Sequence, residues 1–152
     1  MALYFIIPIV IFLDQFTKHA VRTGMSANDS FPIIEEVFHI TYVKNYGAAF
    51  SILQGKQIFL IGVTAVLLVG ITIYLFKQHK DGHWMISLAL ALIVGGGFGN
   101  LIDRIRLGYV VDFFDFRVFP VFNIADICVC TGCGILILYL FYFEVKIKGS
   151  RE

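Results

Sequence analysis

Charged side chains are scarce in this chain of 152 residues: Asp, Glu, Lys and Arg together make up only 15% of it. A soluble domain normally carries about 25% charged residues. The chain is instead 59% hydrophobic, with a mean hydropathy of +0.83. A net charge of +1, without basic runs interleaved with aromatics, argues against a nucleic-acid partner. The composition therefore predicts a single membrane-embedded domain over residues 1–152.

The chain also lacks the residue clusters that hold metals or cofactors. Cys128, Cys130 and Cys133 do not share one helix face and have no histidine nearby, so they favour packing over a zinc site. Their odd number gives no disulfide framework. The glycines between positions 95 and 99 lie inside an apolar stretch with no βαβ unit around them. They therefore indicate close helix packing rather than a nucleotide loop. We expect no metal and no cofactor.

Four apolar stretches are long enough for the roughly 20 residues that cross a hydrocarbon core. They cover about 3–21, 58–76, 84–102 and 124–143. The first is interrupted by Asp14 and Lys18, and Pro8 could kink it. It has neither the cationic leader nor the cleavage site of a signal peptide, so we interpret it as a span. The predicted fold class is an α-helical membrane protein with four transmembrane helices.

The distribution of cations does not orient these four spans. Both termini would lie on one side of the membrane, and segments 22–57 and 104–123 on the other. The side with the termini carries five cations, which are Lys77, Lys80, Lys146, Lys148 and Arg151. The other side carries seven, which are Lys18, Arg22, Lys44, Lys56, Arg104, Arg106 and Arg117. Since cytoplasmic loops usually carry the excess of Lys and Arg, the count leaves the orientation open.

The two segments outside the spans carry β-strand signals. Residues 38–43 and 110–122 are rich in β-branched and aromatic side chains, and Pro120 interrupts the second run. Residues 24–30 are typical of a turn-rich connector. A small β-rich element is therefore expected beside the helices.

Two groups of polar residues share helix faces. Asp14 and Lys18 are four residues apart, which predicts an ion pair that is either structural or chemically active. Asn100, Asp103 and Arg104 lie along one side of the third span's end. Arg104 could hold Asp103 ionised through a charge-assisted hydrogen bond and so support a site. The alternative is an interfacial helix end satisfied by polar residues.

Asp112 and Asp126 are the strongest candidates for acid–base chemistry. Asp112 lies in an apolar, aromatic run, and Asp126 begins the fourth span. Apolar surroundings and a neighbouring carboxyl both raise carboxyl pKa values, so such a pair can share one proton near neutral pH. Asp115 would point to the opposite face of an extended run, solvated or paired with Arg117. From these residues alone, an ion pathway and a structural network remain alternatives.

Five motifs resemble the lipoprotein signal peptidases, the bacterial signal peptidase II aspartic proteases. They are LDQFTK (13–18), NYGAAF (45–50), GNLIDR (99–104), VVDF (110–113) and FNIAD (122–126). The resemblance implies that Asp112 and Asp126 are the catalytic aspartates. It also implies supporting or substrate-binding roles for matching polar positions, which are Asp14, Lys18, Asn45, Gly47, Asn100, Asp103, Arg104 and Asn123.

The resemblance further implies a fold, a location and a substrate. The fold would be four membrane helices with a small extracytoplasmic β-rich cradle, in the bacterial plasma membrane. The termini would be cytoplasmic and the site near the extracytoplasmic face. The substrate would be a diacylglyceryl-modified prolipoprotein, held with membrane lipid and cut on the amino-terminal side of its lipidated Cys. The alternatives are a small proton-coupled carrier or channel and a noncatalytic assembly factor.

Overall fold

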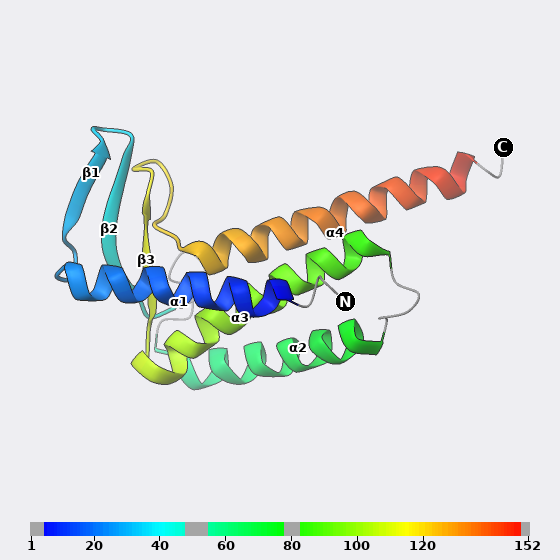
Figure 1. Cartoon of the computed structure of the whole chain (residues 1–152), viewed down its shortest axis with the longest axis horizontal. Helices are drawn as coiled ribbons and strands as arrows, with labels where there is room; N and C mark the ends of the chain where they lie inside the picture. The colour runs from blue at the N-terminus through cyan, green and yellow to red at the C-terminus, as the bar shows by residue number, and fades with distance from the viewer. Residues whose placement is uncertain (1–4, 48–54, 78–82, 150–152) are drawn as a thin grey trace.

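Four helices lie side by side, and a small sheet stands across one end of them (Figure 1). The computed structural model describes residues 5–47, 55–77 and 83–149, with side chains as far as Tyr142. The elements in order are α1 (Ile6–Gly24), β1 (Ser30–Ile34), β2 (Phe38–Asn45), α2 (Gln57–Lys77), α3 (Trp84–Leu107), β3 (Val110–Asp115) and α4 (Ile124–Gly149). Helix α1 begins and α4 ends on the side away from the sheet.

Three of the four predicted spans are confirmed as helices long and apolar enough to cross a membrane. Among the described residues these are α2, α3 and the part of α4 from Ile124 to Tyr142. Large apolar side chains cover their outer surfaces, and Ile58 and Val66 on α2 are 88% and 73% exposed. An outward apolar surface of this extent suits a lipid solvent better than water.

Helix α1 is present, but its role as a fourth span stays a prediction. Its 19 residues include Asp14, Lys18 and Arg22, and the start of the predicted stretch, residues 3 and 4, lies outside the described residues. Asp14 and Lys18 are buried against the other elements, whereas Phe12 and Phe16 point outward. Pro8 lies in the first helical turn, where its missing N–H interrupts no helical hydrogen bond.

Helix α3 is central, since it contacts α1, α2 and α4 as well as β3. Its glycines allow these close approaches. A Cβ added at Gly95 would lie 2.9 Å from Val10 Cβ on α1, and one at Gly96 would collide with the Ala125 carbonyl oxygen on α4. Gly97 faces α2 in the same way. The interpretation of this run as a helix-packing surface is confirmed.

The sheet has the order β1-β2-β3 and is antiparallel throughout. The predicted strand at 38–43 is confirmed as β2, and the connector before β1 is a turn in which Asn28 has a φ of 70°. Strand β1 was not predicted, because Pro32 weakens the signal. Proline is nonetheless accepted in an edge strand, where one side of the backbone is unpaired.

The strand expected over 110–122 is correct only for its first half. Strand β3 ends at Asp115, and the chain then turns at Arg117, which has a φ of 64°. Pro120 lies in this turn region, and Phe122 returns to form an isolated bridge with Phe114. The turn therefore brings the chain from β3 directly to the start of α4.

A substitution at Gly96 tests the close approach of α3 to α4. We expect Gly96→Ala to destabilise the fold by about 1–3 kcal/mol, because the new methyl group would meet a backbone carbonyl that cannot easily move. Gly70→Ala on α2 is the matched control, since nothing lies within 4 Å of its added Cβ. The control should gain about 0.5–1 kcal/mol from helix propensity. Thermal unfolding in detergent micelles measures both, and equal shifts would contradict the packing.

Candidate active site

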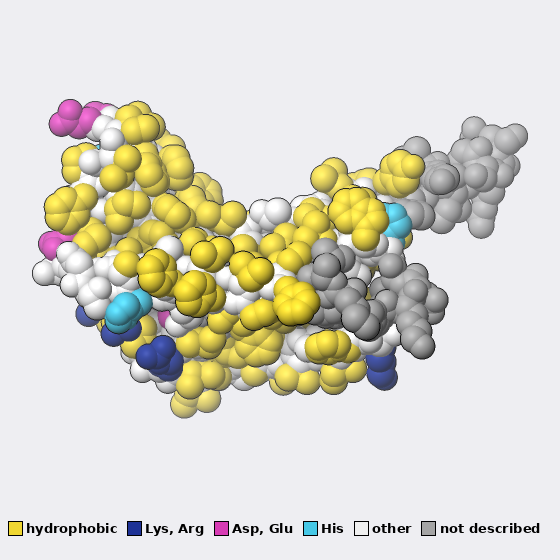
Figure 2. All heavy atoms as spheres, in the orientation of Figure 1, with side chains coloured by type: hydrophobic (Ala, Val, Ile, Leu, Met, Phe, Trp, Pro, Cys, Tyr) yellow, Lys and Arg dark blue, Asp and Glu magenta, His cyan; other side chains and the backbone are white. Residues whose placement is uncertain are grey.

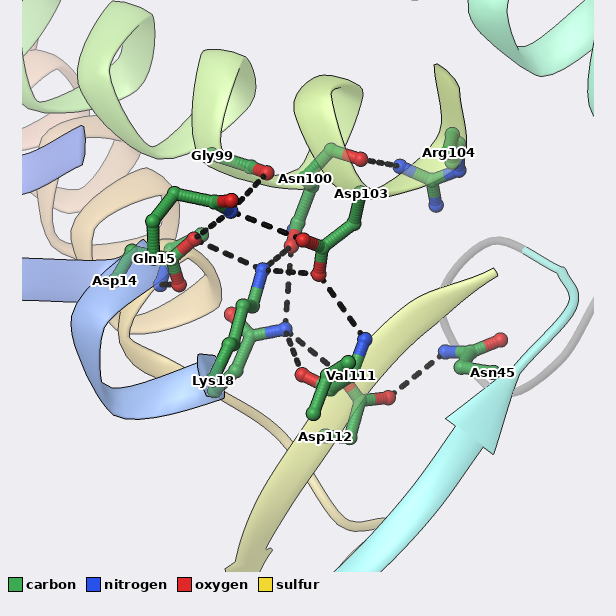
Figure 3. Close-up of polar contacts among 12 residues, drawn as sticks. Asp14, Gln15, Lys18, Asn45, Gly99, Asn100, Asp103, Arg104, Val111 and Asp112 are labelled. Atoms are coloured by element: carbon green, nitrogen blue, oxygen red, sulfur yellow. Dashed lines mark hydrogen bonds and ion pairs between the residues drawn. The ribbon is translucent and has the colours of Figure 1, made fainter. Parts of the chain in front are cut away.

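The ammonium group of Lys18 is buried at the centre of a polar network between α1 and α3 (Figure 3). Its Nζ lies 2.9 Å from Asp14 Oδ2 and 2.9 Å from Asp103 Oδ2. It also donates a 2.8 Å hydrogen bond to Asn100 Oδ1. All three ammonium donors therefore have acceptors, which is what a buried lysine requires to stay charged. The predicted Asp14–Lys18 pair is confirmed, and Asp103 completes it as a triad.

Gln15 joins the same two carboxylates from the side. Its Nε2 donates to Asp103 Oδ1 at 2.9 Å and to the Gly99 carbonyl at 3.1 Å, and it lies 3.3 Å from Asp14 Oδ2. Sequence reasoning missed Gln15, although it lies inside the first motif. Its neutral side chain gives no charge or spacing signal, so the motif itself was the signal that could have identified it.

The triad fixes the start of α4 and the path of β3. Asp14 Oδ1 accepts the backbone N–H of Ala125 at 3.0 Å, and Asp103 Oδ2 accepts that of Val111 at 3.1 Å. Gly99 permits the first of these approaches, because a Cβ there would collide with the Asp14 carboxylate. Two acids on α1 and α3 thus position the two segments that carry the candidate catalytic residues.

Asp126 lies in the first turn of α4 within a reciprocal cap. Its backbone N–H donates to Asn123 Oδ1 at 3.0 Å, and the Asn123 N–H donates back to Asp126 Oδ2 at 3.1 Å. This is the arrangement of a capping box, which satisfies two backbone donors at a helix start. The remaining oxygen, Asp126 Oδ1, accepts a 2.8 Å bond from Asn100 Nδ2. Asn100 therefore links Asp126 to Lys18.

Asp112 lies on β3 beside the same cap. Asn123 Nδ2 donates to Asp112 Oδ1 at 2.7 Å, and Asn45 Nδ2 from β2 donates to Asp112 Oδ2 at 3.0 Å. Burial, and after it the negative charge of Asp126, raise the pKa of Asp112 to about 7, against the lowering effect of the two amide hydrogen bonds. The two acids therefore meet through one asparagine, and Asp112 holds a proton up to near-neutral pH.

Arg104 does not do what the sequence suggested. Its guanidinium turns away from Asp103 (Figure 3) and donates to backbone carbonyls, 3.0 Å to Gly47 and 3.5 Å to Asn100. Neighbouring positions on a helix point about 100° apart, so Asp103 and Arg104 face different partners. The predicted Arg104–Asp103 hydrogen bond is wrong. Arg104 instead holds the Asn45–Gly47 turn, in which the Gly47 N–H donates to Asn45 Oδ1 at 2.9 Å.

Both candidate acids line one cavity with a volume of about 370 Å³. Its polar side chains come from Asn45, Asn100, Arg104, Asp112 and Asp126. The rest of the lining is apolar and is formed by Val110, Phe119, Pro120, Val121, Phe122, Val129 and Cys130. Acids at the wall of a largely apolar cavity form the kind of site that binds a small, mostly apolar chain segment.

Asp115 is separate from this cavity, as its register predicted. It accepts hydrogen bonds from Thr41 Oγ1 at 2.7 Å and from the Arg117 backbone at 2.8 Å, and its Oδ2 lies 3.2 Å from Arg117 Nη1. Burial alone would raise the pKa of Asp115, but these hydrogen bonds and the Arg117 charge outweigh it and hold the pKa below its usual range. The predicted pairing of Asp115 with Arg117 is confirmed.

The chain closely matches proteins of known family. A model of the family described as signal peptidase (SPase) II matches residues 6–142. The lipoprotein signal peptidase of Halothermothrix orenii is 50% identical over 141 residues, which cover 93% of this chain and 96% of that protein. That of Brevibacillus brevis is 46% identical over 140 residues, or 91% and 93%.

Solved structures agree with the sequence relatives. Two, both described as bacterial membrane enzymes, share 36% identity with this chain and have TM-scores of 0.86 and 0.81. The first match covers 93% of this chain and 88% of that chain, and the second 91% and 92%. The resemblance drawn from the five motifs is confirmed.

Removing the buried ammonium tests the triad. Lys18→Met would leave Asp14 and Asp103 buried without their cation, which typically costs roughly 3–5 kcal/mol. The control is Arg117→Met, whose ion pair is half exposed and is worth about 0–1 kcal/mol. We expect thermal unfolding in micelles to show a much larger loss for Lys18→Met. Comparable losses would mean that the triad does not stabilise the fold.

Proposed function

The chain belongs to the signal peptidase (SPase) II family, and we propose that it uses Asp112 and Asp126 to cleave the signal peptide from diacylglyceryl-modified prolipoproteins. As a member of this family it is an aspartic-type peptidase of lipoprotein maturation. The observation that carries the residue assignment is the sharing of one cavity wall by two carboxylates that Asn123 joins.

The two acids take different roles because their surroundings differ. Asp112 is the protonated partner, since its pKa lies at about 7. Asp126 accepts backbone and amide N–H groups at a helix N-terminus, where a carboxylate is favoured. Asp126 takes a proton from a water molecule as the water oxygen attacks the scissile carbonyl carbon. Asp112 gives its proton to the carbonyl oxygen. Collapse of the resulting diol breaks the C–N bond: Asp126 gives its proton to the leaving nitrogen, and Asp112 takes a proton back from a diol hydroxyl.

The polar residues around the acids act as supports. Asn100 accepts a hydrogen bond from Lys18 and donates one to Asp126, so it positions Asp126 relative to Lys18. Asn45 donates a hydrogen bond to the second oxygen of Asp112. Arg104 and Gly47 shape the turn that borders the cavity. Asp14 and Asp103 act one step further back, through the backbone of α4 and β3.

The substrate proposal rests on the membrane setting. A diacylglyceryl group contributes about 0.8 kcal/mol per buried CH₂, so it keeps a precursor in the bilayer beside the apolar helices. The bond on the amino-terminal side of the lipidated Cys then enters the cavity, whose lining is largely apolar.

We propose the same membrane arrangement that the motifs imply. All four helices cross the bacterial plasma membrane as one domain over residues 1–152, with cytoplasmic termini and the sheet and acids near the extracytoplasmic face. Support for α1 as a span comes from the different side chains on its two faces. Asp14 and Lys18 face the protein, and the apolar Ile9, Phe12 and Phe16 face outward. A helix with its charges satisfied internally can lie in lipid. A proton-coupled carrier using the same acids is not favoured by the family.

Amide substitutions of the three aspartates test the catalytic assignment. We expect Asp112→Asn and Asp126→Asn each to lower cleavage at least 10²–10⁴-fold, the usual loss on removing a general acid or base. Asp115→Asn is the matched control on the same strand and should retain most activity, because Asp115 is bound to Thr41 and Arg117 instead. The assay follows release of the signal peptide from a lipidated precursor by purified protein in micelles.

The same assay with an unlipidated precursor tests the substrate class, and its cleavage should be much slower. Equal rates on both precursors would contradict the diacylglyceryl requirement while leaving the protease assignment intact. A dead Asp115→Asn beside an active Asp112→Asn would instead overturn the assigned pair.

The pH dependence of cleavage tests the proton on Asp112. Because the pKa of Asp112 is about 7, raising the pH through 7 removes the proton it must donate, and the rate should fall about tenfold per unit above that value. Asn45→Ala removes a hydrogen bond that lowers this pKa, so the fall should move to higher pH. Thr41→Val, which touches Asp115 rather than Asp112, should leave it in place. The range from pH 6 to pH 9 extends roughly two units above this pKa. A rate that does not change over that range would refute the role of Asp112 as the proton donor.

A reporter that is active only outside the cytoplasm tests the orientation. Fused after position 152 it should be silent, and inserted at the exposed turn near Asn28 it should be active. The reverse pattern would place the acids at the cytoplasmic face.

A further inference from the structure

A second cavity lies where the C-terminal ends of α1 and α3 meet, beside the Lys18 triad. Its volume is about 150 Å³, several times the roughly 30 Å³ that one water molecule occupies. The lining is formed by Gln15, Lys18, His19, Arg22, Asp103, Arg106 and Leu107. None of these residues lines the cavity of Asp112 and Asp126. Figure 2 shows Lys, Arg and His side chains gathered on this part of the surface, among apolar ones.

The charges around this cavity sum to one positive charge. Asp14 and Asp103 together exceed Lys18 by one negative charge, and the oxygens of both acids are already occupied by Lys18, Gln15 and backbone amides. Arg22 and Arg106 add two positive charges at the rim, and both are exposed. One of these positive charges balances the net negative charge of the triad, and the other remains unbalanced. The surplus matches a monoanion such as a phosphodiester.

Arg22 lies near a pair of tyrosines, Tyr42 and Tyr109. The Tyr42 hydroxyl lies 3.2 Å from that of Tyr109. Lys44 lies over both rings, 5.9 Å and 5.3 Å from their centroids. Burial raises the pKa of Tyr42 to about 12, so this phenol is neutral and does not cancel the charge of Arg22. The guanidinium of Arg22 therefore keeps its full charge for binding an anion.

Cations in the last turn of a helix also complement its dipole, and this alone could account for Arg22 and Arg106. Two observations go beyond that explanation. The two arginines frame a cavity, and neither forms an ion pair with an acid within the described ranges 5–47, 55–77 and 83–142. Phe16 and Ile105, each next in the chain to a lining residue, are also 60% and 63% exposed, so both helices that form the cavity carry apolar surface beside it.

We propose that this cavity binds the phosphate group of an anionic phospholipid, with Arg22 and Arg106 at the phosphate and the acyl chains along Phe16 and Ile105. Basic pockets between membrane helices are suited to lipid headgroups in this way. The proposal also accounts for the excess of cations at the sheet end, which runs against the usual distribution of Lys and Arg. It does not depend on the catalytic assignment.

Thermal unfolding in a neutral detergent tests the proposal. Phosphatidylglycerol, added at a few per cent of the micelle, should raise the unfolding midpoint of the wild-type protein by several degrees, and phosphatidylcholine with the same chains should not. The double variant Arg22→Gln/Arg106→Gln should lose this difference. The control, Lys56→Gln/Arg117→Gln, removes two charges that do not line the cavity and should keep it. Cleavage of a lipidated precursor in neutral detergent should be unchanged in the control pair and within a fewfold in the cavity pair.

The remaining outcomes separate the sources of the effect. Equal stabilisation of all three proteins by phosphatidylglycerol would reduce it to general electrostatic attraction and overturn the site. Full stabilisation by inorganic phosphate or glycerol phosphate alone would assign the cavity to a free anion rather than a lipid. If the double variant does not fold, Arg106→Gln alone serves, since this exposed side chain has no role in the triad. An undiminished lipid effect in Arg106→Gln would also refute the proposal.

Discussion

The burial of one ammonium group between two carboxylates is the constraint on which the rest of the structure depends. Lys18 is 2% exposed, and a charge so far from water is tolerated only with several good partners. Its three acceptors come from α1 and α3, so these helices can pack in only one register if all three bonds are kept. In lipid, where no water would replace a lost partner, the requirement is stricter than in a soluble protein.

The candidate catalytic geometry follows from that register. Asp14 and Asp103 each use one further oxygen contact to hold a backbone amide, at the start of α4 and in β3. Asn100 extends the network to Asp126, and Asn123 extends it to Asp112. The absence of a side chain at Gly99 is as necessary as the charges, because α1 could not otherwise approach. The acids are therefore positioned by segments from all parts of the chain, without a metal ligand set among the described residues.

Local signals in the sequence predicted local features. Apolar stretches predicted the helices, and the spacing of Asp14 and Lys18 predicted their pair, because both depend on residues that are close in the chain. The same reasoning failed for Arg104, whose partner Gly47 comes from a distant turn. Reasoning from local sequence also missed β1. Pro32 makes this strand unfavourable by itself, and only its pairing with β2 stabilises it. Asn123 followed three residues later by Asp126, just before an apolar run, was a readable capping signal that composition and charge alone did not reveal.

The cap at Asn123 and Asp126 has a consequence for how this fold could evolve. In many enzymes the reactive groups are a burden on stability, and replacing them makes the protein more robust. Here Asp126 caps the start of a long apolar helix as well as facing the cavity. The two oxygens of Asp126 accept hydrogen bonds from the Asn123 N–H and the Asn100 amide. In an asparagine, the NH₂ group would replace one of these oxygens and face a donor. Loss of activity by substitution at this position would therefore also cost stability. Even without selection for activity, the folded chain would still favour Asp126.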